Sequence, residues 1–417
     1  MAQRPRRTFV AGVIVMVAVL LSTVHAQTVI SFARLSSQAH NAYLEPLIAA
    51  FEAANPDVVI ENVESAGDGY EGLAQTALLG LAAGTPPDLV QVGFTLLPTL
   101  VASGGPIALD PFMEASGFDK SSLMPGMLEL GQLGGSNYIM PIGVSTPVMY
   151  YNLDLFRAAG LDPESPPTTW DEAREAAQAL VDAGYQGILW GWSITGNWLF
   201  QTMLESAGGR MGMDTEAGHV ATFDDEAGEQ VLSYLQGLAQ DGLMPVTEAT
   251  VQTFASGQLG MLVDSSFQRV NTPRQVNAEV RLAPVPIPAG GEVRLPAGGN
   301  GVMMFSRDPA KQEAAWRFLE FLAGPEGGRI VAENTGYTPG NAALLETLAQ
   351  ENAGDPDYVL VLQQVANVVP WHAWPSNNGT RISQVIKDMQ LEVLLGRATP
   401  SEALERAAAE TNQLLAE

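Results

Sequence analysis

The sequence predicts an α/β protein with two lobes, and three observations support this fold class. The chain has 417 residues, which is more than one hydrophobic core holds, because single cores stop growing at about 250–300 residues. Strand-like and helix-like segments alternate over the first part of the chain, an order typical of parallel α/β layering. Cysteine is absent and 46% of the residues are hydrophobic, so the fold depends on its cores and not on disulfides.

The first predicted elements alternate between short buried strands and helices. We expect strands over residues 28–33, 57–63 and 89–92, and helices over residues 39–54, 70–83 and near 96–103. Asn55-Pro56 ends the first helix and Gly84 closes the second, as proline and glycine commonly do. These strands should therefore lie parallel in one sheet that helices cover.

Helical patterns dominate the second part of the chain. Two strands come first, at residues 138–142 and 148–152. Helices are then expected over residues 170–183, 198–206, 226–241 and 251–256, before a turn into a strand at 257–263. A stretch rich in proline and glycine, residues 284–301, separates this strand from a helix over 309–323, and the tail has helices over 382–395 and 400–415.

The N-terminal segment has the pattern of a signal peptide. Arg4, Arg6 and Arg7 precede an uncharged run over residues 10–21, and a small-x-small site ends at Ala26. We expect cleavage after Ala26 and a periplasmic mature protein, whose formal charge falls from −26 to −29 with the loss of three arginines. The arginine pair leaves twin-arginine export open beside the ordinary route. No cysteine follows the segment, so we expect no lipid anchor.

The charge balance excludes several classes of partner. Asp and Glu number 46 against 20 Lys and Arg, and the isoelectric point is about 4.4. Binders of nucleic acid and of anionic membrane surfaces need the opposite balance. The absence of cysteine also excludes thiol catalysis, cysteine-ligated zinc and iron–sulfur clusters.

No pattern in the sequence indicates catalysis. The four histidines are scattered, with none in a metal-ligand spacing, and there is no nucleophile elbow or phosphate-binding loop. Acidic pairs such as Asp171-Glu172 and Asp224-Asp225 fall where helices begin, which indicates N-terminal capping. We therefore expect no enzyme activity, no metal and no cofactor. Because carboxylates are abundant, an exported glycoside hydrolase remains as a remote alternative.

Six landmark segments follow one another along nearly the whole mature chain. They are residues 51–57 (Phe-Glu-Ala-Ala-Asn-Pro-Asp), 84–91 (Gly-Thr-Pro-Pro-Asp-Leu-Val-Gln), 150–161 (Tyr-Tyr-Asn-Leu-Asp-Leu-Phe-Arg-Ala-Ala-Gly-Leu), 167–172 (Pro-Thr-Thr-Trp-Asp-Glu), 254–261 (Phe-Ala-Ser-Gly-Gln-Leu-Gly-Met) and 315–322 (Ala-Trp-Arg-Phe-Leu-Glu-Phe-Leu). In this order they resemble the substrate-binding proteins of ABC importers, carbohydrate family 1. The resemblance implies a type II-like periplasmic-binding-protein clamshell, with a ligand cleft between two lobes.

Within that family the chain is most similar to the glycerol-3-phosphate-binding members, through residues 102–105, 145–152, 335–339 and 379–381. Carried over by position, the resemblance places around the ligand Tyr70, Ser145, Ser265 or Ser266, Gly299, Tyr337 and Arg381. It implies that the serines, the glycine amide, Tyr337 and Arg381 hold a phosphate. The chain departs from the pattern at Phe94, where the family has a glutamate that receives the glycerol hydroxyls. The likeness therefore supports a phosphate end better than a glycerol end.

Each of these residues also has a structural interpretation. Arg381 is expected in a loop rich in Asn, Gly and Thr and not on a helix flank, and its fork suits phosphate, but a salt bridge or helix-start contact is the alternative. Gly299 lies in a glycine cluster that could be only a hinge crossing. Ser265 and Ser266 could be turn residues at a strand end, with one of them at the ligand.

Two tryptophan clusters suggest stacking against a sugar or polyol. Trp190, Trp192 and Trp198 fall close together, as do Trp371 and Trp374. Tryptophan rings stack on the C–H faces of sugars, and core packing is the alternative for each. We select Trp192, because Gly191 and Ser193 flank it, and Trp374, because it is nearest to Arg381.

The expected lobes are residues 27–143 with 300–335, and residues 144–299 with 336–417. The chain would cross between them three times, near Gly143, Gly299 and Gly336, since glycine absorbs hinge torsion at least cost. The hypothesis is a monomeric binding protein that takes a small phosphorylated polyol or organophosphate and presents it to a membrane permease with its ATPase. A neutral or sulfonated sugar or oligosaccharide in the same cleft is the alternative ligand.

Overall fold

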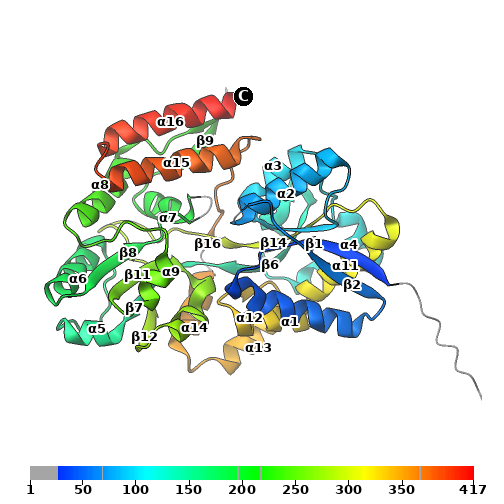
Figure 1. Ribbon diagram of the computed structural model, residues 1–417, viewed down its shortest axis with the longest axis horizontal. Helices are drawn as coiled ribbons and strands as arrows, with labels where there is room; N and C mark the ends of the chain where they lie inside the picture. The colour runs from blue at the N-terminus through cyan, green and yellow to red at the C-terminus, as the bar shows by residue number, and fades with distance from the viewer. Residues whose placement is uncertain (1–26, 68, 195–196, 217, 366–367) are drawn as a thin grey trace, which may run out of the picture.

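Two separate sheets, each with its own buried core, organise the chain into two lobes (Figure 1). The computed structural model describes residues 27–417 apart from 68, 195–196, 217 and 366–367. The expected signal peptide, residues 1–26, and its cleavage site lie outside the described residues. Two lobes of mixed α/β structure were predicted from the chain length and from the alternation of strands and helices, and this prediction is confirmed.

The first sheet has six strands in the order β15-β6-β14-β3-β1-β2. Their bounds are β1 (Thr28–Ala33), β2 (Val58–Val63), β3 (Leu89–Gly93), β6 (Ile139–Ser145), β14 (Gly298–Met304) and β15 (Thr338–Pro339). β1 pairs in parallel with β2 and β3, as the βαβ pattern predicted. β14 is antiparallel to both β3 and β6, and β15 is antiparallel to β6. The sheet is therefore mixed, and its parallel part is the N-terminal part.

Helices cover both faces of the first sheet. One face packs against α1 (Gln38–Ala54), α11 (Pro309–Ala323) and α12 (Pro325–Asn334), and the other against α2 (Gly69–Ala83) and α3 (Leu97–Ala102). The strand residues alternate between these two cores: Leu89 faces the first, and Val90 and Val92 face the second. This period of two on a sheet buried on both faces produces nearly continuous apolar strands.

The second sheet has four strands in the order β12-β7-β11-β8. They are β7 (Pro147–Asn152), β8 (Gln186–Trp190), β11 (Leu259–Ser265) and β12 (Val280–Ala283). α5 (Leu153–Ala158), α6 (Trp170–Asp182) and α9 (Thr250–Ala255) pack against this sheet. α8 (Glu226–Gln240), α15 (Gly379–Leu394) and α16 (Pro400–Ala416) pack on one another, and α8 also packs on α7 (Trp198–Ser206), as Figure 1 shows for the upper part of this lobe.

Shorter elements complete the two lobes. They are α4 (Asp110–Ser116), α10 (Thr272–Gln275), α13 (Ala342–Glu351), α14 (Pro356–Val365), β4 (Gln132–Leu133), β5 (Ser136–Asn137), β9 (Gly212–Thr215), β10 (Gly218–Ala221), β13 (Leu295–Pro296) and β16 (Val368–Val369). Sequence patterns predicted none of these elements, and they also missed β8 and β12. The more important omission is β14, because residues 298–301 had been taken as part of the connecting stretch. Its glycines contribute no β-propensity, and only pairing with β3 and β6 makes this segment a strand.

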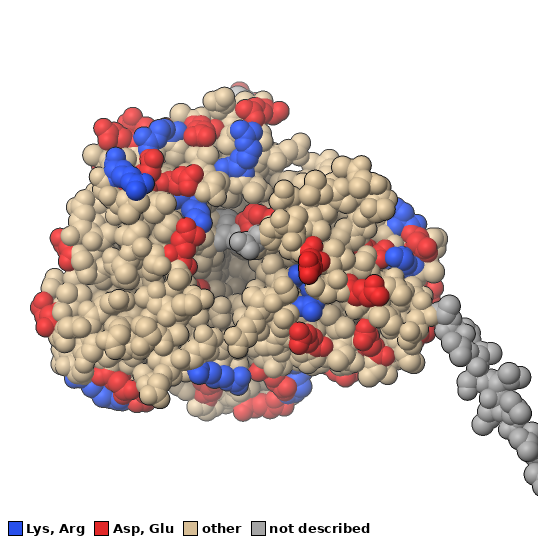
Figure 2. All heavy atoms as spheres, in the orientation of Figure 1, with Lys and Arg blue, Asp and Glu red and all other residues tan. Residues whose placement is uncertain are grey.

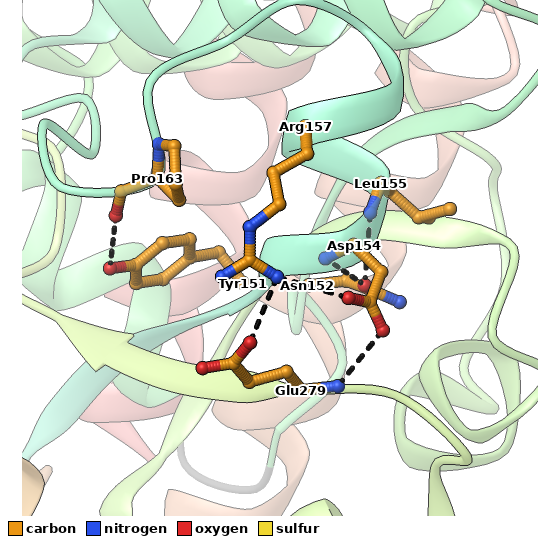
Figure 3. A network of polar contacts seen from close by, with 7 residues as sticks. All are labelled: Tyr151, Asn152, Asp154, Leu155, Arg157, Pro163 and Glu279. Carbon is orange, nitrogen blue, oxygen red and sulfur yellow. Dashed lines mark hydrogen bonds and ion pairs between the residues drawn. The ribbon is translucent and has the colours of Figure 1, made fainter.

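The Tyr-Tyr-Asn landmark has a structural role in the second lobe (Figure 3). Asn152 is the N-cap of α5, and its side-chain oxygen accepts from the backbone N–H groups of Asp154 and Leu155. Arg157 pairs with Asp154 at 3.1 Å and with Glu279 at 2.8 Å, which ties α5 to the segment before β12. The motif therefore ends a strand, caps a helix and joins both to a neighbouring segment.

The chain segments between the lobes pack tightly against one another. β6 ends at Ser145 in the first sheet, and β7 begins at Pro147 in the second. Gly299 has a φ of +126°, and the carbonyl of Gly143 stands where its Cβ would be. Gly336 has the carbonyl of Ser266 in the same position. Glycine is required here because backbones approach too closely for any side chain. That the chain crosses between the lobes at these glycines stays a prediction.

Candidate functional site

A cavity of about 200 Å³ lies between the lobes, lined by side chains from both sheets and from the segments that join them. The lining residues are His40, Tyr70, Ser145, Ile194, Trp198, Asp264, Ser265, Phe267, Gln268, Gly298, Gly299, Tyr337 and Trp371. Figure 2 shows the surface hollowed between the two halves of the molecule. Elements far apart in sequence therefore converge on one concave site.

Aromatic rings form two walls of this interlobe cavity. On one side Phe267 lies 5.1 Å from the ring of His40 and 4.6 Å from that of Tyr337, measured between centroids. On the other side the rings of Trp198 and Trp371 are 6.0 Å apart. The Trp198 indole donates to the carbonyl of Pro296 at 2.9 Å, which holds the ring in place. Such walls suit the apolar face of a small solute.

Hydroxyl and amide groups also line the cavity. Ser145 lies at the end of β6, opposite Gly298 of β14. Ser265 is at the end of β11 and its Oγ accepts from the N–H of Phe267 at 3.2 Å. The side chain of Gln268 also lines the cavity. These groups can donate to and accept from hydroxyls of a bound molecule.

A buried polar network fixes Tyr337, which lines the cavity. Asn300 donates from Nδ2 to the Tyr337 hydroxyl at 2.8 Å, and Gln91 donates to Asn300 Oδ1 at 3.0 Å. The hydroxyls of Tyr70 and Tyr337 lie 3.5 Å apart. Burial raises the pKa of Tyr337 to about 12, so its phenol stays protonated and able to donate. The network connects α2, β3, β14 and the segment before β15 at one point.

The charges at the cavity do not suit an anion. Among the described residues that line it there is no lysine or arginine. Desolvation, aided by the nearby charge of Arg34, lowers the pKa of His40 to about 4, so this ring is neutral near pH 7. Asp264 accepts from Thr250 at 2.8 Å and from the N–H of Ser265 at 2.6 Å, although burial raises the pKa of its carboxyl. The local groups are thus neutral or acidic.

Five of the ten residues predicted from the sequence meet at this cavity: Tyr70, Ser145, Ser265, Gly299 and Tyr337. Their positions came from the family resemblance, and the structure brings them together across more than 250 residues of sequence. The other five lie elsewhere.

Arg381 and Phe94 do not line the cavity. Arg381 is in the first turn of α15 and its side chain is 63% exposed, with Glu417 as ion-pair partner at 3.1 Å. This is the salt bridge at a helix start that the sequence had left as the alternative. Phe94 is 5% exposed and packs in the core between the first sheet, α2 and α3. Phe94 begins a 3₁₀ helix, and its ring does not border this cavity, although the carry-over by position had put it at the ligand.

Ser266, Trp192 and Trp374 are also buried away from the cavity. The Ser266 hydroxyl accepts from the N–H of Thr146 at 3.0 Å and thereby joins two interlobe segments. Trp192 packs in the core of the second lobe. Trp374 packs in the same core, edge-on to His372 at 4.4 Å. For all three, packing explains the residue, which was the alternative interpretation for each tryptophan.

Sequence reasoning missed several lining residues: His40, Ile194, Trp198, Asp264, Phe267, Gln268, Gly298 and Trp371. Trp198 and Trp371 belong to the two clusters singled out, but the other member was selected each time. Flanking glycine and serine did not identify the right ring. Trp198 starts a helix directly after Asn197, which has a φ of +55°. A non-glycine residue with a positive φ often marks a functional site. This backbone angle therefore indicates Trp198 better than the flanking residue types do.

Comparison with known proteins identifies the family. Residues 36–329 match the model of the bacterial extracellular solute-binding proteins. The chain belongs to this family. It is the solute-binding component of an ABC importer, and members of the family bind solutes and are not enzymes. Among the described residues no helix is long and apolar enough to cross a membrane, and no cluster of side chains could hold a metal ion.

Three relatives illustrate the similarity. The sn-glycerol-3-phosphate-binding periplasmic protein UgpB of Escherichia coli (strain K12) is 27% identical, over 98% of this chain and 97% of its own. The structure of UgpB from Mycobacterium tuberculosis with glycerophosphocholine has a TM-score of 0.82 at 21% identity, over 94% of this chain and 98% of its own. Maltose-bound T. maritima MalE3 has a TM-score of 0.81 at 21% identity, over 93% of this chain and all of its own. The two-lobe binding-protein fold is therefore confirmed.

Proposed function

We propose that the interlobe cavity captures a small, neutral, polyhydroxylated solute, such as a sugar or polyol. The observation that carries this proposal is the lining of the cavity: aromatic walls, hydroxyl and amide groups, and an acidic side chain, with no lysine or arginine among its described residues. A phosphate needs donors that carry positive charge, or several converging N–H groups, to offset its desolvation. Neutral hydroxyls need only the acceptors and donors that are present.

The volume of the cavity supports a small ligand. About 200 Å³ is below the roughly 300–1,000 Å³ of sites for drug-sized molecules. Asp264, Ser145, Ser265 and Gln268 would pair with ligand hydroxyls, and Trp198 would cover a C–H face. A ligand that touches both lobes favours the closed clamshell, which a permease with its ATPase would then recognise. We propose that the binding protein acts as a monomer.

A phosphorylated polyol is the second candidate. It is favoured by the names of the relatives and by five of the residues carried over from the glycerol-3-phosphate-binding members, since these five line the cavity. The position of Arg381 argues against it, because the exposed guanidinium pairs with Glu417 and not with the site. A ligand phosphate would also lie near Asp264.

Calorimetric titration of ligand-free protein separates the two candidates. The protein is unfolded and refolded first, so that any co-purified solute is removed. Monosaccharides, disaccharides and free polyols are compared with glycerol-3-phosphate and glycerophosphocholine. We expect a neutral compound to bind most tightly. If a phosphate ester binds more tightly than every neutral compound, the first proposal is wrong and the second stands.

A pair of tryptophan variants tests whether the ligand binds in the interlobe cavity. Trp198→Leu should weaken binding about fivefold or more, because a stacked ring contributes roughly 0.5–1.5 kcal/mol beyond its buried area. Trp374→Leu is the matched control, since Trp374 is equally buried but does not line the cavity. Equal affinity losses in the two variants would place the ligand elsewhere.

A further inference from the structure

A second and larger concavity lies in the C-terminal lobe. This groove has a volume of about 930 Å³. Its walls are the C-terminal half of α7 with the following Gly208-Gly209 turn, the β9–β10 hairpin, residues 290–294 before β13, and residues 369–375. Trp371 is the one described residue that lines both the groove and the interlobe cavity. The groove is therefore a separate site on the other side of this ring.

Two described arginines line the groove without an ion pair or a side-chain hydrogen bond. The described Lys and Arg residues mostly form ion pairs in this acidic chain, and Arg34 and Arg307 donate to carbonyl oxygens. Among the described residues Arg210 and Arg294 have neither an ion pair nor a side-chain hydrogen bond, and both line the groove. In a protein with 46 acidic residues, such a pair in one concavity is unexpected.

None of the described acids that line the groove forms an ion pair with these arginines. The carboxylate of Glu205 accepts from Gln201 at 2.8 Å, and that of Asp214 lies 2.8 Å from Nδ1 of His219. Burial raises the pKa of Glu205, although Arg210 and Arg294 lie close enough to oppose this shift. Glu292 is at the exposed rim and does not pair with Arg294, two residues away. The guanidinium groups thus remain available to a ligand.

Hydrogen bonds hold another part of the groove wall in place. Gln201 donates to the carbonyl of Pro370 at 3.0 Å, and its Oε1 accepts from the N–H of His372 at 3.0 Å. Gly208, with a φ of +94°, turns the chain so that backbone groups border the groove. A ligand would meet a preformed polar surface, which lowers the ordering cost of binding.

We propose that this groove is a second binding site, for a small molecule bearing carboxylate or phosphate groups, which Arg210 and Arg294 hold. Planar guanidinium forks match these groups in geometry and charge. The net charge of the protein repels anions at long range, so capture requires such a local pair. The proposal is independent of which ligand occupies the interlobe cavity.

Citrate and pyrophosphate are the probes for this site, titrated by calorimetry at constant ionic strength. We expect saturable binding of at least one probe at a single site. The double variant Arg210→Ala/Arg294→Ala should weaken it by about tenfold or more, since charge-assisted hydrogen bonds are lost. Arg274→Ala/Arg397→Ala is the matched control, because those two arginines are equally exposed and unpartnered among the described residues but lie outside the groove.

Three outcomes would overturn the proposal. The first is the absence of saturable binding to the wild-type protein at millimolar probe concentrations. The second is an equal loss in both double variants, which would indicate a diffuse charge effect. The third is loss of probe binding in Trp198→Leu, which would place the anion in the interlobe cavity. Because all four arginines are exposed, the variants should fold, and circular-dichroism melting curves verify this.

Discussion

A single methyl group at Gly298 should damage the interlobe cavity. Gly298 of β14 faces Ser145 of β6, and a Cβ built on it would lie 2.5 Å from Cζ2 of Trp198 and 2.7 Å from Oγ of Ser145. Real Cβ atoms do not approach other heavy atoms this closely, so at least one neighbour must move. The Trp198 ring is anchored by its hydrogen bond to Pro296, and it has little room to yield.

The expected cost of Gly298→Ala is that of overpacking a tight site, about 1–3 kcal/mol. If the displaced ring and hydroxyl are the ligand contacts, this cost lowers affinity by about fivefold to a hundredfold, at 1.4 kcal/mol for each factor of ten. Calorimetry with the tightest ligand from the titration series measures the affinity, and thermal melting measures the stability.

Gly354→Ala is the matched control for this experiment. No heavy atom lies within 4 Å of a Cβ at Gly354, so the same chemical change should leave both affinity and stability nearly unchanged. If Gly298→Ala behaves like Gly354→Ala in both measurements, the cavity is not built as described. If it loses stability but keeps full affinity, Trp198 and Ser145 are not ligand contacts.

Four further predictions follow from the positions of individual groups. Arg381→Ala should change ligand affinity by less than twofold and stability by about 0–1 kcal/mol, because its exposed pair with Glu417 contributes little. A tenfold loss of affinity would show that Arg381 contacts the ligand. Phe94→Glu should lower the free energy of unfolding by about 3 kcal/mol or more, since it buries a carboxylate in the core, and denaturant titration measures this. His40 and His372 have pKa values lowered to about 4, so the unfolded chain binds more protons and stability should fall as pH drops from about 6.5 to 4; a His40→Gln/His372→Gln variant that keeps the full wild-type pH dependence would refute this. Saturating ligand should lower the radius of gyration in X-ray scattering, and superposable profiles of ligand-free and saturated protein would contradict a clamshell.

Local patterns predicted the elements well where the determinants are local. Thr169 was expected to precede a helix with acids in its first turn, and it caps α6 through a reciprocal capping box with Glu172. Asp225 caps α8, as its position before a predicted helix suggested. The strand at residues 28–33 and the helices at 198–206 and 309–323 have the predicted bounds. Caps and periodicity act over a few residues, so a sequence displays them directly.

Patterns failed where a residue's state depends on a distant partner. β14 is a strand because β3 and β6 pair with it, although its first four residues are Gly-Gly-Asn-Gly. Flanking residues favoured Trp192 and Trp374 as stacking rings, but Trp198 and Trp371 line the cavity. Each indole in these clusters is buried, and only the fold determines which of them borders an open space.

The amino-acid sequence was sufficient to predict the two-lobe α/β class, the acidic character and the likeness to importer binding proteins, and that likeness supplied five residues that line the interlobe cavity. Folding of the whole chain was needed to show that Arg381 pairs with Glu417, that Phe94 lies in a core, and that two arginines without ion pairs share a groove. These two kinds of finding differ in the sequence separation of the residues whose contacts determine them. Elements follow from neighbours along the chain, whereas a cavity follows from contacts such as that of Tyr70 with Tyr337, 267 residues apart, which only packing of the whole chain creates.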